Sequence, residues 1–171
     1  YESIQHEVVE DSFEQIFQLQ VVLQIAQAVS LIFAMVIIGY ASYGLNFLLE
    51  IQFDYPTFAV YCLLYSGISI ILCSCYGLWA SKTQYSFVIR FYHCVVLPIL
   101  TFVLVGTSVL NFYILPHAPA EVREAYDRLR VDNYTITEVQ TLVQQQLLVG
   151  GILTISVALF QLVPVSSGVQ L

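Results

Sequence analysis

Charge is what this sequence has least of. Only 5 of the 171 residues are Lys or Arg and 12 are Asp or Glu, so that charged residues make up 10% of the chain. A soluble globular domain carries about 25% charged residues. With 58% hydrophobic residues and a mean hydropathy of +0.79, the composition excludes an ordinary soluble domain and indicates residence in a membrane.

Basic residues are the scarcer of the two charged classes, and the formal net charge is −7. A nucleic-acid-binding protein needs a basic patch or stripe, so the sequence predicts no nucleic-acid partner. The basic residues are spread over three places, at Lys82, at Arg90 and within 123–130. They therefore do not form the cluster that recognises anionic lipid headgroups.

Ionisable groups and catalytic motifs are missing from the apolar runs. Their centres contain no Asp, Glu, Lys or Arg, whereas proton relays, ion-coupled transporters and voltage sensors place such groups there. This argues strongly against a pump or transporter and only slightly against a pore for neutral solutes. Because the chain also lacks an HExxH motif, a Gly-rich phosphate loop and a Ser-centred nucleophile elbow, we expect no enzyme, no catalytic residue and no cofactor.

The four cysteines, Cys62, Cys73, Cys75 and Cys94, fall in apolar runs, so no disulfide framework is expected. A zinc site uses CxxC pairs, whereas Cys73 and Cys75 are two residues apart and point to different sides of a helix. We therefore expect no metal or redox centre and interpret the cysteines as small hydrophobes. The alternative for Cys73 and Cys75, near the end of an apolar run, is S-palmitoylation.

Long apolar runs are what the sequence has in abundance. A helix needs about 20 residues to cross about 30 Å of hydrocarbon, which offers no partner to backbone N–H and C=O groups. Runs of this length cover residues 19–49, 57–80, 88–115 and 147–165. The connections 50–56 and 81–87 are short, which makes consecutive helices antiparallel neighbours. The predicted fold is all-α: an integral membrane, four-helix antiparallel transmembrane bundle.

The polar stretches divide the chain around this predicted bundle. Residues 1–18 form an acidic N-terminal segment, residues 19–165 the transmembrane domain and residues 166–171 a short C-terminal tail. The longest loop, residues 116–146, carries most of the charge.

Three positions carry the signature of a helix start. In the longest loop, Thr137 followed by Gln140 fits a capping box, from which one helix continues into the fourth span. Pro119 suits the first turn of a separate short helix in the same loop. Ser12 followed by Gln15 is expected to cap a helix that leads into the first span.

Small and polar residues within the runs indicate how the helices pack. Where lipid surrounds the helices, close backbone approach through small residues and hydrogen bonds between polar side chains hold a bundle together. Ladders of small residues at four-residue spacing are Ala26, Ser30 and Ala34; Ser69, Cys73 and Gly77; and Gly150, Thr154 and Ala158. The amides expected to bond between helices are Gln24, Gln27, Asn111 and Gln161. A polar conduit for ions or substrate is the alternative interpretation of these amides.

Further features surround the second connection. Aromatic side chains on both sides of it predict an interfacial belt of Tyr76, Trp79, Tyr85, Phe91 and Tyr92. His93 lacks a second metal ligand at matched spacing, so we expect it to form a hydrogen bond at the interface or between helices. Pro98 is expected to kink the third helix.

The orientation follows from the same connection. Lys82 and Arg90 flank it without nearby acids, so the positive-inside tendency places it, with both termini, on the cytoplasmic or equivalent side. The arginines of the longest loop oppose this assignment. Asn133 begins an Asn-Tyr-Thr sequon for N-glycosylation, which this orientation places outside, although such triplets also occur by chance.

The layout of four spans, two tight connections and a longest loop before the last span is similar to that of tetraspanins. Tetraspanins also carry a small-residue-rich second helix, a Gly-Cys-Cys-Gly-like patch and a Lys or Glu just after it. The residues in comparable places here are Gly67, Cys73, Cys75, Gly77, Ala80 and Lys82. The longest loop departs from the family because it is shorter and contains no cysteine. The family's partner-recognition surface is therefore not carried over.

The residues and the resemblance together predict a non-enzymatic, tetraspanin-like membrane scaffold that organises partner proteins laterally in a plasma membrane or endomembrane. Its expected partners are other integral membrane proteins and lipids, within a larger complex. The alternative is an accessory structural subunit of a large respiratory or photosynthetic complex in a mitochondrial or plastid membrane. A neutral-solute channel is the third interpretation.

Overall fold

Every element of the protein is a helix in the computed structural model, wherever the backbone is described (residues 2–51, 54–83, 86–129 and 135–168). Side chains are described over residues 20–49, 57–83, 87–124, 126 and 135–162. In chain order the elements are α1 (Glu2–Ile51), α2 (Asp54–Lys82), α3 (Ser86–Phe91), the π-helical turn η1 (Tyr92–Val96), α4 (Leu97–Ile114), α5 (Ala118–Leu129) and α6 (Ile136–Gly168). The prediction of an all-α protein is confirmed.

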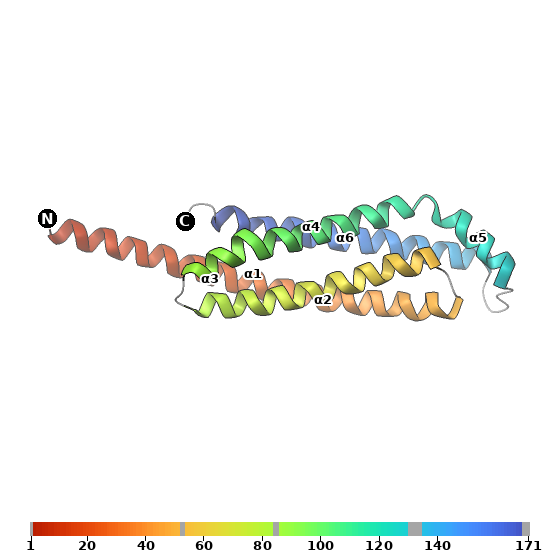
Figure 1. Ribbon diagram of the computed structural model, residues 1–171, viewed down its shortest axis with the longest axis horizontal. Helices are drawn as coiled ribbons and strands as arrows, with labels where there is room; N and C mark the ends of the chain where they lie inside the picture. Colours follow the sequence, from red (N-terminus) through yellow and green to blue (C-terminus); the bar gives the residue numbers. More distant parts are fainter. Residues whose placement is uncertain (1, 52–53, 84–85, 130–134, 169–171) are drawn as a thin grey trace.

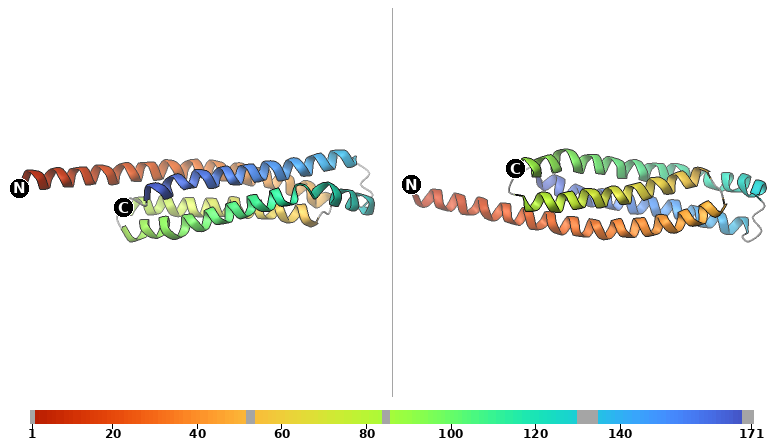
Figure 2. Two further views of the ribbon diagram at one scale, coloured as in Figure 1. Left: turned by 90° about the horizontal axis from the view of Figure 1, so that it is seen from above. Right: turned by 60° about the horizontal axis from the view of Figure 1, so that its bottom comes forward.

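Four rods lie side by side along the longest axis of the molecule (Figures 1 and 2). They are α1, α2, the continuous α3–η1–α4 segment and α6. The C-terminal end of α1, the first turn of α2 and the short helix α5 lie at one end, which we call the α5 end. The C-terminal end of α2, the helix α3 and the C-terminal end of α6 lie at the other, which we call the α3 end. The first part of α1 continues past the other rods beyond the α3 end (Figure 1).

Each rod contains a stretch long and apolar enough to cross a membrane. These stretches are Gln20–Leu49, Thr57–Lys82, Phe87–Ile114 and Ile136–Leu162. The first three agree closely with the predicted runs. The fourth begins at Ile136 rather than at residue 147, because the helix that carries it starts inside the predicted loop. By length and composition, the chain has the build of a multi-pass membrane protein.

The buried side chains of each rod recur mostly at alternating spacings of four and three residues. This mean period of about 3.5 residues is typical of helices that keep one seam toward their neighbours along their whole length. The buried lines are Leu23, Gln27, Ser30, Ala34, Ile37, Ala41, Gly44 and Leu48 on α1; Leu63, Gly67, Ile70, Ser74, Gly77 and Ser81 on α2; Leu97, Leu100, Leu104, Thr107, Asn111 and Ile114 on α4; and Val139, Val143, Gln146, Gly150, Thr154, Val157 and Gln161 on α6.

A π-helical turn interrupts the third rod just before Pro98. Pro98 has no N–H, and its ring crowds the carbonyl group four residues earlier, so a regular α-helix is not accommodated there. In η1, the Leu97 N–H instead bonds to the Tyr92 carbonyl group, five residues earlier. The irregularity that the sequence predicts at Pro98 is therefore a wide turn over residues 92–96. It brings Tyr92 onto the buried line that continues with Leu97 and Leu100.

The helix α5 packs against the first turns of α6 at the α5 end. Its buried Ala118 and Val122 belong to the same core cluster as Val139 and Val143 of α6. Gln140 Nε2 donates a hydrogen bond to the Pro119 carbonyl group over 3.1 Å. The short helix predicted around Pro119 is present and begins at Ala118.

The helix α6 begins with a capping box two residues earlier than predicted. Thr135 Oγ1 accepts a hydrogen bond from the Glu138 N–H at 3.4 Å. Glu138 Oε2 accepts hydrogen bonds from both the N–H and the hydroxyl of Thr135, each at 2.8 Å. The predicted box from Thr137 to Gln140 was wrong: a carboxylate is the stronger acceptor for the free N–H groups of a helix start, and the Gln140 amide is already bonded to α5.

The predicted helix start at Ser12 was also wrong. The helix α1 runs from Glu2 to Ile51, so Ser12 lies inside it and does not cap it. Residues 2–19 contain no Gly or Pro that would break a helix. At the other end of the chain, α6 continues to Gly168, so the predicted tail is helical over residues 166–168. Residues 169–171 lie outside the described part of the chain.

We expect Thr135→Val to destabilise the start of α6 by about 1 kcal/mol, because it removes the hydroxyl that caps the helix. Amide hydrogen exchange over residues 136–139 measures this as faster exchange. The variant is made without glycosylation, because Thr135 also completes the sequon of Asn133. Thr137→Val is the matched control and leaves exchange unchanged. Equal acceleration in both variants contradicts the position of the cap.

Candidate functional site

The amides predicted to bond between helices have different surroundings. Gln27, Asn111 and Gln161 are buried, whereas Gln24 is half-buried. Gln161 Nε2 donates to Ser30 Oγ over 2.6 Å and so links α6 to α1. Asn111 Nδ2 bonds within its own helix, to the Thr107 carbonyl group at 2.8 Å.

Two of the three predicted small-residue ladders lie on buried faces. They are Ala26, Ser30 and Ala34 on α1, and Gly150, Thr154 and Ala158 on α6. On α2, Gly77 is buried but Ser69 and Cys73 are only half-buried. The buried small positions there are Ala59, Ser66, Gly67, Ser74, Gly77, Ala80 and Ser81. A strict four-residue spacing drifts away from a seam whose mean spacing is about 3.5 residues.

Hydroxyl groups join the helices in the middle of the bundle. Ser66 Oγ and Thr107 Oγ1 share a hydrogen bond of 2.9 Å between α2 and α4. Ser108 Oγ donates to the Gly151 carbonyl group of α6 over 2.9 Å. These hydroxyl groups were not among the residues predicted to bond between helices. Thr107 lies on the 3.5-residue seam of α4, and Ser66 and Ser108 each lie one residue from the seam of their helix.

A second amide link joins α1 to α6 near the α5 end. Gln146 Nε2 donates to the Tyr40 carbonyl group, and the Tyr40 hydroxyl donates to the Gln145 carbonyl group, both at 3.0 Å. Gly44 makes this approach possible, because a Cβ there would collide with the Gln146 amide. Gln146 was not among the amides predicted to bond between helices, because it was assigned to the longest loop.

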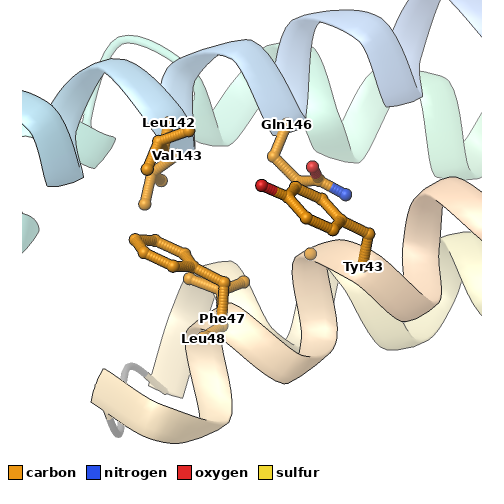
Figure 3. A pocket seen from close by; sticks show the side chains of 7 residues that line it. Tyr43, Phe47, Leu48, Leu142, Val143 and Gln146 are labelled. Carbon is orange, nitrogen blue, oxygen red and sulfur yellow. The ribbon is translucent and has the colours of Figure 1, made fainter.

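A small cavity adjoins this link. Figure 3 shows Phe47 facing Leu142 and Val143 across it, with the ring of Tyr43 beside Gln146. The cavity has a volume of about 20 Å³ and is lined by side chains of α1 and α6. This volume is sufficient for about one water molecule, so the cavity is too small for an organic substrate.

Tyr92 was wrongly predicted to lie in the interfacial belt. It is fully buried, and a Cβ added to Gly77 would lie only 2.7 Å from its hydroxyl oxygen. Its ring centroid lies 5.8 Å from those of both Tyr76 and His93. The wide turn of η1 turns Tyr92 inward, which regular helical spacing does not anticipate. Trp79 and Phe91 are exposed as the belt requires, and Tyr85 lies outside the described residues.

His93 is also buried, and neither of its ring nitrogens has a hydrogen-bond partner among the described residues. The hydrogen bond expected for it is therefore not observed there. Within the same part of the chain, no three His, Cys, Asp or Glu side chains gather as a metal site would require. The cysteines are free; Cys62 and Cys73 are half-buried, and Cys75 and Cys94 are exposed.

The arrangement is therefore one of interhelical bonds and close contacts rather than of reactive groups. Asn133, the predicted glycosylation site, lies outside the described residues. Comparison with known proteins adds no relative, since no protein family, curated protein or solved structure matches the chain. The likeness to tetraspanins therefore stands on the layout and residues of this chain alone.

We expect Gly77→Leu to disrupt the bundle, because its side chain meets Tyr92 and the Gln27 amide carbon, which lies 3.1 Å from the position of a Cβ. Overpacking of this kind costs about 1–3 kcal/mol, and a leucine exceeds the usual added methylene. Gly150→Leu meets Leu63 at 3.1 Å and is expected to act in the same way. Size-exclusion profiles and thermal stability in mild detergent measure the effect.

Gly106→Leu is the matched control for both variants. A Cβ at Gly106 has nothing within 4 Å, so the control keeps the size and stability of the unmodified chain. If Gly77→Leu and Gly150→Leu behave like the control, these glycines are not points of close helix contact.

Proposed function

We propose that the chain is a non-enzymatic membrane scaffold: an antiparallel bundle of four membrane-spanning helices that organises other integral membrane proteins laterally. The observation that carries this proposal is the division of its side chains. Small and polar side chains pack between the chain's own helices together with leucines and isoleucines, and further large apolar side chains cover the outside. Such a molecule is suited to contact lipids and other transmembrane helices.

The interior supports a structural role more than a transport role. Its polar groups tie neighbouring helices together, as between Ser66 and Thr107 and between Gln161 and Ser30. No Asp, Glu, Lys or Arg is buried among the side chains described. Pumps and ion-coupled transporters place such groups inside their spans. The interior therefore favours a scaffold over the polar conduit.

The exterior supports contact with lipid and with other helices. The most exposed aromatic side chains of the spans include Phe102, which is 81% exposed, and Phe87, which is 75% exposed. A helix that is apolar on its outer face as well as its inner face is suited to a membrane. In water the same surface would be a large patch prone to association.

The outer face of α1 offers a place for a partner helix to approach closely. Gly39 lies there, and a Cβ added to it would have nothing within 4 Å. Ser42 and Asn46, one and two helical turns further on, are exposed on the same face. Polar side chains inside spans usually face protein rather than lipid. We therefore assign this face to contact with a transmembrane helix of a partner.

Gly39→Leu is expected to lower the recovery of partner proteins several-fold while leaving the bundle itself folded. Its side chain keeps a partner helix away but meets nothing within the chain. Extraction in mild detergent followed by quantitative mass spectrometry measures the recovery. Gly106→Leu, on the outside of α4, is the control. Equal recovery from the two variants refutes the assignment of partner contact to α1.

The composition of the extracted complexes separates the scaffold from the alternative function. A scaffold is expected with several partners at low and variable stoichiometry. An accessory subunit of a respiratory or photosynthetic complex is expected at fixed stoichiometry with the redox or light-harvesting subunits of that complex. The second result replaces the scaffold proposal with the subunit.

The neutral-solute channel is tested with the purified chain alone. Liposomes that contain it are compared with empty liposomes for the flux of small neutral solutes. The scaffold proposal expects equal flux, because the interior polar groups pack between helices. Higher flux in the protein-containing liposomes supports the channel instead.

The proposal includes a plasma membrane or endomembrane location with the longest loop outside, as the layout shared with tetraspanins implies. In that case we expect Asn133 to carry a glycan, seen as a loss of mass on endoglycosidase treatment. Asn133→Gln abolishes this mass loss. A chain that shows no mass loss when extracted from its native membrane, but is glycosylated when directed to the secretory pathway, indicates an organellar location.

A further inference from the structure

A group of buried polar side chains lies between α1, α2, η1 and α6 toward the α3 end. Gln27, Ser74, Tyr92 and Gln161 are 0% exposed, and His93 is 7% exposed. We call these five residues the polar layer. Among the described residues, no hydrogen-bond partner exists for Gln27 Nε2 and Oε1, Ser74 Oγ, the Tyr92 hydroxyl, His93 Nδ1 and Nε2, or Gln161 Oε1.

Contacts place these side chains next to one another. The Tyr92 hydroxyl oxygen and the Gln27 amide carbon lie 2.7 Å and 3.1 Å from the position of a Cβ on Gly77, so both side chains meet over this glycine. The Gln27 amide lies within hydrogen-bonding reach of the Tyr92 hydroxyl, but the orientation of the two groups does not meet the geometry of a direct hydrogen bond. Ser74 lies one turn before Gly77 on the same buried line.

The remaining members adjoin this pair. His93 packs edge-on against the Tyr92 ring, with centroids 5.8 Å apart. Gln161 bonds to Ser30, which lies one turn after Gln27 on α1. The apolar side chains of Leu23, Ala80 and Leu97 form one cluster with Tyr92. The polar layer is thus a compact group surrounded by apolar packing.

Unpaired polar groups of this kind are costly. Each one costs about 1–3 kcal/mol when buried without a partner, and folded proteins satisfy nearly all of them through protein atoms or ordered water. Among the described residues, no surrounding side chain is hydrogen-bonded to these atoms. A bound small molecule is therefore the physical means by which the polar layer becomes satisfied.

The chemistry of the unpaired atoms identifies this molecule. The Gln27 amide contributes both a donor and an acceptor, Gln161 contributes an acceptor, and the hydroxyl groups of Ser74 and Tyr92 act as either. A cation would satisfy only acceptors and an anion only donors. Water donates and accepts at once and is small enough for a packed interior.

We propose that the polar layer is a binding site for ordered water inside the bundle. The water bridges the Tyr92 hydroxyl to the Gln27 amide over Gly77. The π-helical turn before Pro98 shapes the site, since it turns both Tyr92 and His93 inward. Gly77 lies five residues before Lys82, or about 7.5 Å along the helix, so the site lies near the α3 end of the bundle. The proposal holds for a scaffold and for a subunit alike.

Radiolytic labelling of the full chain in lipid nanodiscs tests this site. A short X-ray pulse turns water into hydroxyl radicals, which modify only side chains in contact with that water, and mass spectrometry locates the modification. We expect Tyr92 to be modified several-fold faster than Phe33, despite its complete burial. Phe33 is the internal control, because it packs against Phe160 and the apolar core.

Rapid mixing with water that carries a heavy oxygen isotope distinguishes bound water from transient leakage. If the water was bound before mixing, the oxygen added to Tyr92 at the shortest mixing times is the ordinary isotope. The heavy isotope is then added only at longer mixing times. Modification of Tyr92 no faster than that of Phe33 overturns the proposal and indicates a direct bond between Tyr92 and Gln27. Immediate incorporation of the heavy isotope also overturns it, because the water then enters only when the bundle opens.

Substitutions in the polar layer provide the matched comparison. Gln27→Leu and Ser74→Ala are expected to lower Tyr92 labelling several-fold and to leave Phe33 labelling unchanged. Ser74→Ala changes the side-chain volume little, so it preserves the packing if Gln27→Leu disturbs the fold. Unchanged Tyr92 labelling in a folded Ser74→Ala variant refutes the assignment of Ser74 to the site.

Discussion

Close approach between helices is the interaction on which the rest of this structure depends. Between helices surrounded by lipid, hydrophobic burial contributes little, so contact distance and interhelical hydrogen bonds hold a bundle together. Five of the described glycines provide that distance, because another side chain occupies the space beside each: Tyr92 and Gln27 beside Gly77, Gln146 beside Gly44, Ile38 beside Gly67, Leu63 beside Gly150, and Phe112 beside Gly151. The amide and hydroxyl bonds form where the small residues let the helices meet.

The same constraint connects Pro98 to the interior of the bundle. A proline in the third rod leads to a π-helical turn, and the added residue in that turn directs Tyr92 toward Gly77. A bulky tyrosine is accommodated only because its neighbour on α2 lacks a side chain. The local irregularity of one helix and the small residue of another therefore belong to a single packing arrangement, which gathers polar atoms inside an apolar bundle.

In this arrangement the inner surface of each helix contacts the other helices, and the outer surface faces away from the bundle. The inner seam carries nearly all of the hydrogen-bonding groups that tie rods together, as with Gln161 and Ser30. The outer surface is apolar and aromatic, apart from positions such as Ser42 and Asn46 on α1. Groups that move protons or ions would have to lie within the seam, and there the described side chains serve packing. The physical division favours a protein that acts through contacts with its neighbours in the membrane.

The sequence by itself determined the class of fold and the main helices. Residue composition and run length are enough for this, because an apolar run of about 20 residues in hydrocarbon satisfies its own backbone groups by forming a helix. It also placed two small-residue ladders and the amides of Gln27 and Gln161 inside the bundle, although only Gln161 forms the predicted bond between helices among the described residues. Only the tertiary structure decided which residues of α2 face the other helices, that Tyr92 is buried, and that Gln146 bonds to α1. The first depends on a seam of about 3.5 residues and the third on the close approach at Gly44, and both are set by how neighbouring helices meet. The second depends on a π-helical turn, and a proline by itself predicts an irregular turn without fixing which side chain that turn directs inward.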